Sequence, residues 1–148
     1  MELFEKLTLI QTEFKSKKSR FNSFGKYNFR SAEDILEGLK PLITKYKVYF
    51  TINEELHFNA DGPVIISTAT ISDGKNAIQA KAVVGVDMNQ KGMQTPQKYG
   101  SASSYGKKYA LGNLLLIDDT ADADATNNHG SDRFKQSSGG ATGTDLGF

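Results

Sequence analysis

The spacing of apolar residues near the start of the chain predicts a helix over residues 2–19. Apolar side chains recur at intervals of four, three and four residues, which places them on one narrow stripe: Leu3, Leu7, Ile10 and Phe14. A stripe this narrow is typical of a seam between two helices. We therefore expect it to be a candidate surface for assembly with another copy, as are the unpaired edges of a sheet.

A second amphipathic helix is predicted to begin at Ser31, which suits an N-cap and is followed by acidic residues in the first turn. Pro41 lies inside this helix and removes one backbone hydrogen bond, so we expect a kink there. The apolar face of the helix is formed by Ile35, Leu39, Leu42 and Tyr46.

Three segments with strand-like composition follow, at residues 48–56, 64–72 and 76–87. Asp73-Gly74, between the second and the third, suits a tight type I′ hairpin turn. These features predict an antiparallel meander of three strands. One face of its last strand is formed by Ile78, Ala80, Ala82, Val84 and Val86.

Residues 88–99 are polar and are expected to form a loop, and a last helix is predicted at about residues 101–117. The predicted order is helix, short extended segment, helix, three strands, loop and helix. This order favours the α+β class over an alternating α/β fold, with two helices before the sheet.

The end of the chain differs in composition from the rest. From Asp118 onward it is rich in Asp, Ser, Gly, Thr and Asn and has few large apolar residues, so it cannot bury enough apolar surface to fold. We therefore expect one folded domain at residues 1–119 and a disordered acidic tail at residues 120–148. Residues 1–117 carry a net charge of +5, and residues 118–148 carry −4. Such asymmetry occurs among polyanion-binding proteins, but also among proteins that bind none.

The composition argues against several classes of protein. The chain has no cysteine, and only His57 and His129 could supply imidazole, so we expect no metal site. The first residues lack the apolar core of a signal peptide, and no apolar run reaches the roughly 18 residues that a membrane helix needs. We expect an intracellular protein without a membrane partner.

The stretch GSASSYGKKYALG, from Gly100 to Gly112, invites comparison with a nucleotide-binding P-loop. That loop has the form GxxxxGK[ST] after a buried strand. Here five residues separate Gly100 and Gly106, Lys107 is followed by Lys108 instead of a hydroxyl residue, and a polar loop precedes the stretch. The chain is therefore not expected to be a P-loop ATPase, and we expect no cofactor.

On a helix, Tyr105, Lys108, Tyr109 and Gly112 fall on one arc of about 100°, and Lys107 points elsewhere. This arrangement suits phosphate contacts by lysine and base stacking by tyrosine, but tyrosines packed in a core with solvated lysines fit the pattern equally. The preceding loop favours the nucleic-acid alternative because it is polar and basic. Serines at the expected helix start could add free N–H groups for an anion. These further candidates are Lys91, Gln97, Lys98 and Ser101.

A second basic and aromatic segment, GKYNFRS at residues 25–31, places Lys26 and Arg30 on one side of an extended chain. An ordinary amphipathic strand explains this pattern too, and such a strand would still display two cations.

Two segments of the chain, GKYNFRSAEDILEGLKPLI and KGMQTPQKYGSASSYGKKYALGNLLLIDD, resemble the ERF (essential recombination function) family of phage single-strand annealing proteins. The resemblance covers roughly residues 1–120, and its most specific element is GSxxSYxKKYxL, from Gly100 to Leu111. The family commonly has arginines where this chain has Lys107 and Lys108, so the charge is kept without the bidentate geometry of arginine.

The resemblance implies a β-β-β-α core and a ring or helical filament of subunits. It also implies ATP-independent annealing of complementary single strands in phage homologous recombination, within the cytoplasm of the bacterial host. The implied partners are single-stranded DNA, the annealed duplex intermediate and further copies of the chain. The implied DNA-binding residues are Lys26, Arg30, Lys91, Gln97, Lys98, Ser101, Tyr105, Lys107 and Lys108.

Other functions remain open from the sequence. A passive single-strand binding protein would share every charge and aromatic argument. A nuclease would need clustered carboxylates, and the cluster Glu33, Asp34 and Glu37 is better explained by the first turns of a helix, so we expect no enzyme. A protein that binds no nucleic acid is also possible. The ending GTDLGF resembles the acidic tips of bacterial single-strand binding proteins, which dock host repair proteins, although an inert end is an alternative.

Overall fold

The computed structural model describes residues 1–16, 18, 20–23 and 27–117. Met1–Ser16 and Ala32–Ile117 form one compact unit, and Lys17–Ser31 belongs to a second. The first unit contains the helices α1 (Leu3–Glu13), α2 (Ala32–Tyr46) and α3 (Thr95–Leu115) and a three-stranded sheet. The described part of the second unit contains a short antiparallel hairpin, β1 (Arg20–Asn22) and β2 (Tyr27–Phe29). The predicted tail lies outside the described residues.

The sheet is the predicted antiparallel meander, with β3 (Tyr49–Asn59), β4 (Gly62–Ser72) and β5 (Ala77–Gly85) in that order. The α+β prediction is therefore confirmed. The first hairpin is longer than predicted, because Asn59 pairs with Gly62 and only two residues form its turn. The stretch HFN continues β3 beyond the predicted end at residue 56, and Gly62 permits the sharp reversal with a φ of 120°.

The second hairpin turn is not of the expected type I′. That type needs positive φ at both central residues, whereas Gly74 alone has it in this turn, with a φ of 93°. The turn is closed instead by the Asp73 side chain. Its Oδ1 accepts hydrogen bonds from the backbone N–H groups of Lys75 (2.9 Å) and Asn76 (2.8 Å).

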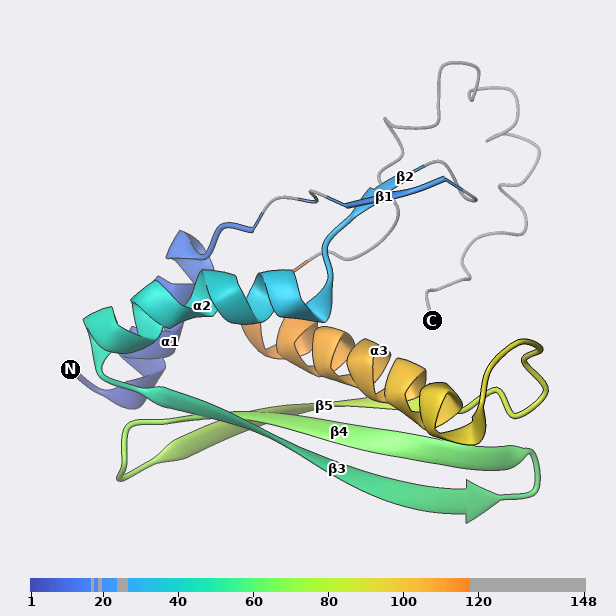
Figure 1. The fold of residues 1–148 in the computed structure, drawn as a ribbon. Coiled ribbons are helices and arrows are strands. Elements are labelled where there is room, and N and C mark those ends of the chain that lie inside the picture. Colours follow the sequence, from blue (N-terminus) through green and yellow to red (C-terminus); the bar gives the residue numbers. More distant parts are fainter. Residues whose placement is uncertain (17, 19, 24–26, 118–148) are drawn as a thin grey trace, which may run out of the picture. The chain divides into compact units, whose positions relative to one another are not determined.

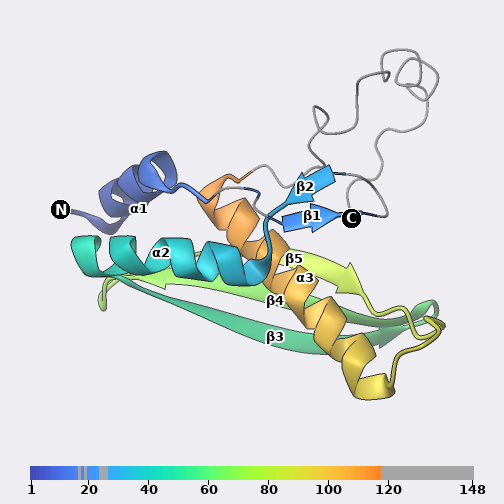
Figure 2. The same cartoon turned by 45° about the horizontal axis from the view of Figure 1, so that its top comes forward.

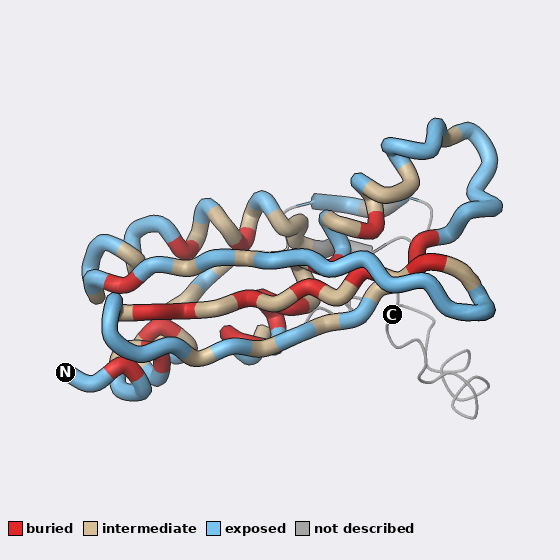
Figure 3. The backbone as a smooth tube through the Cα atoms, turned by 90° about the horizontal axis from the view of Figure 1, so that it is seen from below, coloured by how far each residue is buried: buried red, intermediate tan, exposed pale blue. Residues whose placement is uncertain are grey.

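One face of the sheet packs against helices, and the other is open within this unit (Figures 1 and 2). Alternate residues of the central strand β4 are buried toward the helices, among them Ile65, Ser67, Ala69 and Ile71. Figure 3 views the sheet from its open side, where β3 is almost entirely exposed. The alternation along β4 shows that burial on one face selected this register.

The helix α1 ends at Glu13, so the predicted extent of residues 2–19 is wrong. Phe14 leaves the helix with an extended ψ of 129° while its N–H still bonds to the Ile10 carbonyl. The Phe14 ring packs close to Gly38 on α2, where a Cβ atom would lie 3.0 Å from the ring. The basic residues that follow offer no apolar side chain that would continue the packed stripe.

The apolar stripe of α1 is part of the core and is not an assembly surface. Leu3, Leu7 and Ile10 are buried together with residues of α2, α3 and the sheet. Gln11 adds a polar link, because its Nε2 donates to the Leu114 carbonyl at the end of α3 (2.8 Å). The expectation that this stripe joins two copies is therefore wrong.

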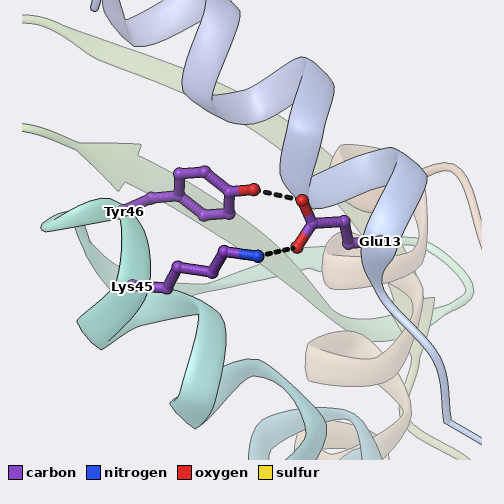
Figure 4. Close-up of polar contacts among 3 residues, drawn as sticks. All are labelled: Glu13, Lys45 and Tyr46. Atoms are coloured by element: carbon purple, nitrogen blue, oxygen red, sulfur yellow. Dashed lines mark hydrogen bonds and ion pairs between the residues drawn. The ribbon is translucent and has the colours of Figure 1, made fainter.

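The helix α2 begins directly after Ser31, as predicted, and continues through Pro41 to Tyr46. A polar cluster joins its end to the end of α1 (Figure 4). The Tyr46 hydroxyl and the Lys45 ammonium (2.9 Å) donate to different oxygens of the Glu13 carboxylate. The hydrogen bonds from Tyr46 and then Lys45 lower the pKa of Glu13. The bond with Glu13 in turn raises the pKa of Tyr46 and that of Lys45.

Candidate nucleic-acid interface

The helix α3 begins at Thr95, six residues before the predicted start. Gln94 and Gln97 form a reciprocal capping box, in which the Gln94 N–H donates to Gln97 Oε1 (2.7 Å), and Pro96 lies in the first turn. Residues 95–99 are therefore helical, and the expectation of a loop up to residue 99 is wrong.

This earlier start changes the role of the serines. The backbone N–H of Ser101 lies in the second turn of α3, inside the range where helix carbonyls accept these groups. The expected set of free N–H groups at the serines is therefore wrong. Ser101 keeps its hydroxyl as its possible contribution, and its side chain is half-buried.

The middle of α3 presents an aromatic and basic ridge. The rings of Tyr105 and Tyr109 are stacked, with centroids 5.9 Å apart and planes inclined by 30°. The Lys108 Nζ lies 5.6 Å from each ring centroid, which is within cation–π range of both. Tyr105 is 50% exposed. We call Tyr105, Lys108 and Tyr109 the α3 ridge; the structure places them together as the helical spacing predicted.

The last turns of α3, from Ala110 to Leu115, are buried on several sides. Gly112, which the sequence placed on the same arc as the tyrosines, is buried, as are Leu111, Leu114 and Leu115. In these turns the helix packs in one cluster with residues of α1, α2 and the sheet. The surface available to a ligand on α3 therefore lies before Ala110.

The remaining basic candidates on this side of the chain have different surroundings. Lys107 is half-buried on α3, one residue from the ridge. Lys98 donates from Nζ to the Met88 carbonyl (2.8 Å), which ties the first turn of α3 to the loop before it. Lys91 is exposed in that loop. The Gln97 side-chain oxygen is used by the capping box, so Gln97 has a structural task as well.

The second basic segment belongs to the other unit. Arg30 follows β2 directly and is half-buried, and β2 confirms the predicted extended conformation at residues 27–29. Lys26 lies outside the described residues. The structure thus places six of the nine candidates on α3 and Lys91 in the adjoining loop, whereas Arg30 belongs to the other unit.

An acidic neighbour of α3 was not predicted from the sequence. The Ser103 hydroxyl donates to Glu54 Oε2 on β3 (2.5 Å). Glu54 continues the alternation of Phe50 and Ile52, which pack on the core from the helix-facing side of β3. That alternation was available in the sequence and places a carboxylate beside the helix. An approaching phosphate is repelled there and favoured at the lysines.

The described residues offer neither a cluster of metal ligands nor a membrane-spanning helix. No group of three or more His, Asp or Glu side chains in residues 1–16, 18, 20–23 and 27–117 is arranged to hold a metal ion. Within the same residues, no helix is long and apolar enough to cross a membrane. Glu37, one of the carboxylates considered above for a nuclease, forms an exposed ion pair with Lys40 (2.6 Å).

Comparison with known proteins finds two similarities. A family model described as the ERF superfamily matches residues 3–140. The chain is also 43% identical, over 123 residues, to the protein of Salmonella phage P22 named essential recombination function protein. The match covers 83% of this chain but 59% of that relative, so the chain spans well under two thirds of its length. No solved structure matches the chain significantly.

Proposed function

Because the chain belongs to the ERF superfamily, we propose that it binds single-stranded DNA and anneals complementary strands, without ATP, in phage homologous recombination. The observation that carries the proposal is the α3 ridge, where an ammonium lies against two stacked rings and Tyr105 is half exposed. The name of the phage P22 relative supports a recombination role. Annealing itself is our inference from the family resemblance and the residue types.

The side chains of the ridge suit a protein that pairs strands. Such a protein must hold the sugar-phosphate backbone and leave the edges of the bases accessible to a complementary strand. Lysines contact phosphates without reading sequence. Stacking on an exposed tyrosine contributes about 1–3 kcal/mol per base and tolerates every base. Lys107 and Lys108 would hold phosphates, and Tyr105 would stack on a base.

Further candidates complete the proposed DNA site. Lys91, Lys98 and Ser101 extend it along the first half of α3 and the preceding loop, and Gln97 contributes there beside its capping role. Arg30 and Lys26 form a second, weaker contact. The single strand and the annealed duplex intermediate are the proposed partners.

One subunit offers few contacts, so the proposed protein acts as a homo-oligomer, either a ring or a helical filament. About four lysines per subunit would neutralise phosphates, which gives weak binding at physiological salt. A strand bound along many subunits gains by effective concentration, because each further contact is intramolecular. The proposal needs no cofactor and no catalytic residue.

The rest of the proposal concerns context. We assign residues 1–119 to the annealing domain and residues 120–148 to an acidic tail, for which the alternatives are an inert end and a contact with host repair or single-strand binding proteins. The family model extends to residue 140, so part of this tail belongs to the matched region. The place of action is the cytoplasm of the bacterial host.

The experiment that tests the function is an annealing assay. Two complementary oligonucleotides, one of them labelled, are mixed with the protein in the absence of any nucleoside triphosphate, and duplex formation is followed by fluorescence transfer. We expect the protein to accelerate duplex formation severalfold at low salt. A rate equal to that of the bare oligonucleotides contradicts the proposal. A slower rate with clear binding identifies the alternative, a passive coat for single strands.

A further inference from the structure

We propose that β3 is a docking strand for a second copy of this chain, which adds its own β5 in parallel and so extends the sheet from subunit to subunit. The inference rests on the oligomeric part of the proposed function, and it names the two surfaces that meet. It replaces the apolar stripe of α1, which is buried in the core.

The strand β3 has an unpaired edge. It is an edge of the three-stranded sheet, and no described strand pairs with its outer side along Tyr49–Asn59. A long unpaired edge is a template for another strand. Its helix-facing side also carries exposed apolar groups: Leu56 is 47% and Phe58 is 70% exposed. The residues opposite them on β4, Ile65 and Pro63, are buried. In this region the buried face of the sheet therefore ends at β4, and β3 is left uncovered.

The two edges of the sheet differ in charge. Residues 48–74, which include β3 and β4, contain four carboxylates and no Lys or Arg. Residues 74–86, which include β5, contain Lys75 and Lys81 and no carboxylate. Pairing of β3 with the β3 of another copy would bring Glu54 and Glu55 near their counterparts, which is unfavourable. Pairing with β5 brings opposite charges together.

The register gives this pairing a specific contact. Asn53, Thr68 and Lys81 form one row across the sheet, and Glu55 lies two residues beyond Asn53 on the same open face. Both β3 and β5 run antiparallel to β4, so a second copy in the same orientation places its β5 parallel to β3. If β5 of the second copy pairs with β3 so that these rows continue across both subunits, its Lys81 lies beside Asn53. It is then a diagonal neighbour of Glu55, at about 7–8 Å between Cα atoms, which a lysine side chain spans.

The packing of α3 agrees with this arrangement. Gly106 and Ala102 of α3 lie against side chains of β4 and β5, and Leu56 and Phe58 of β3 remain exposed. In a sheet continued from subunit to subunit, each subunit adds three strands, so the helix α3 recurs about every 14 Å. A helix with its side chains is about 10 Å wide, so a strip over β3 remains between neighbouring helices. Leu56 and Phe58 lie in this uncovered strip, and their side chains become buried between two copies.

Two existing contacts must adjust. The Asn113 side chain donates from Nδ2 to the Lys81 carbonyl (2.7 Å), and Glu55 lies 3.3 Å from the His57 ring. Both contacts are exposed, so their exchange for contacts with a second copy costs little. Because the surfaces that meet are different, the contact is head-to-tail, and its repetition gives a ring if it closes and a helical filament if it does not.

A charge exchange tests the interface. In Glu55→Lys and in Lys81→Glu, like charges would face each other, and we expect self-association to weaken at least tenfold. The double variant restores opposite charges and should recover most of the association. The mass distribution is measured by sedimentation velocity without DNA, and circular dichroism establishes that each variant is folded. The matched control is Glu37→Lys on α2, which should assemble like the unchanged protein.

The apolar part of the interface has its own pair of variants. Phe58→Ser should weaken assembly, whereas Phe4→Ser on α1, at 63% exposure, should not. Assembly unaffected by the single charge variants, or not recovered in the double variant, overturns the interface and leaves the proposed oligomer standing. A protein that is monomeric at all concentrations overturns both. Strand binding is judged separately by the anisotropy of a labelled oligonucleotide.

Discussion

Gly106 shows how a single residue of the GSASSYGKKYALG motif serves the fold. A Cβ atom at this position would overlap the Ser67 hydroxyl on β4 and lie 3.9 Å from a methyl group of Val84 on β5. Ser67 is fully buried, and its Oγ has no hydrogen-bond partner among the described residues. The glycine therefore sets how closely α3 approaches the sheet. At Gly100, in the same helix, a Cβ atom would meet no atom within 4 Å.

We expect Gly106→Ala to destabilise the protein. Overpacking a tight contact costs about 1–3 kcal/mol, which exceeds the gain of about 1 kcal/mol that alanine brings to a helix. Gly100→Ala is the matched control, because it receives the helix gain without the clash and should be slightly stabilising. Urea unfolding measures the free energy of unfolding of both variants, provided that the m-value stays unchanged.

The origin of the Gly106 effect is tested by a second change. Ser67→Ala removes the hydroxyl that the new methyl group meets, so it should recover part of the loss when combined with Gly106→Ala. Additive effects of the two substitutions would show that the contact with Ser67 is not the cause. Equal stability of the two glycine variants would show that the close approach is absent.

The Glu13 cluster predicts a pH dependence of stability. The folded protein lowers the pKa of Glu13 below its ordinary value of 4.5, through Tyr46 and Lys45. A lowered carboxyl pKa gives stability that is present above the unfolded pKa and is lost as the pH falls through the folded one. The raised pKa values of Tyr46 and Lys45 give stability that is lost as the pH rises through them.

We therefore expect Glu13→Gln to be less stable than the unchanged protein near neutral pH. The difference should shrink below the lowered pKa of Glu13 and again at strongly alkaline pH. Thermal unfolding across pH measures it. Glu37→Gln is the control, because the ion pair of Glu37 with Lys40 is exposed and lies within one helix. A difference between Glu13→Gln and the unchanged protein that is independent of pH would contradict this account.

At the scale of elements, the sequence predicted those that hydrophobic periodicity defines. The three strands and α2 follow from alternation and from apolar spacing, and the structure confirms them. Their ends depend on side-chain contacts with the backbone, which periodicity does not record. The start of α3 depends on the pair Gln94 and Gln97, whose glutamine at the N-cap differs from the usual Ser or Thr. The end of α1 depends on how Phe14 packs at Gly38.

The same distinction between local spacing and tertiary contacts applies to the candidate site. The α3 ridge follows from positions one turn apart on a single helix, so the sequence could place Tyr105 and Lys108 together. The contact of Ser103 with Glu54, like that of Gly106 with Ser67, joins residues that become neighbours only when α3 lies on the sheet. The hairpin partner β1 was also missed, because it is a strand of three residues in a basic stretch.

At the scale of the whole molecule, the separation of charge sets the salt dependence of DNA binding. The body carries +5 and the acidic end −4, so the overall charge of +1 hides the proposed DNA surface. Neutralising about four phosphates per subunit gives a slope near −3 for log K against log salt, with a factor of about 0.7 per phosphate for single strands. Anisotropy titrations of an unstructured oligonucleotide over a series of salt concentrations measure this slope.

Lys107→Ala/Lys108→Ala should make that slope shallower by about 1.4 per subunit, because two of the phosphate contacts are lost. Affinity should fall most at low salt, where released counterions contribute most to binding. The matched control is Lys15→Ala/Lys40→Ala, which removes the same charge from exposed positions outside α3. If both double variants make the slope shallower by the same amount, net charge and not the position of the lysines on α3 holds the strand. If neither does while circular dichroism stays unchanged, the lysines of α3 are not phosphate contacts.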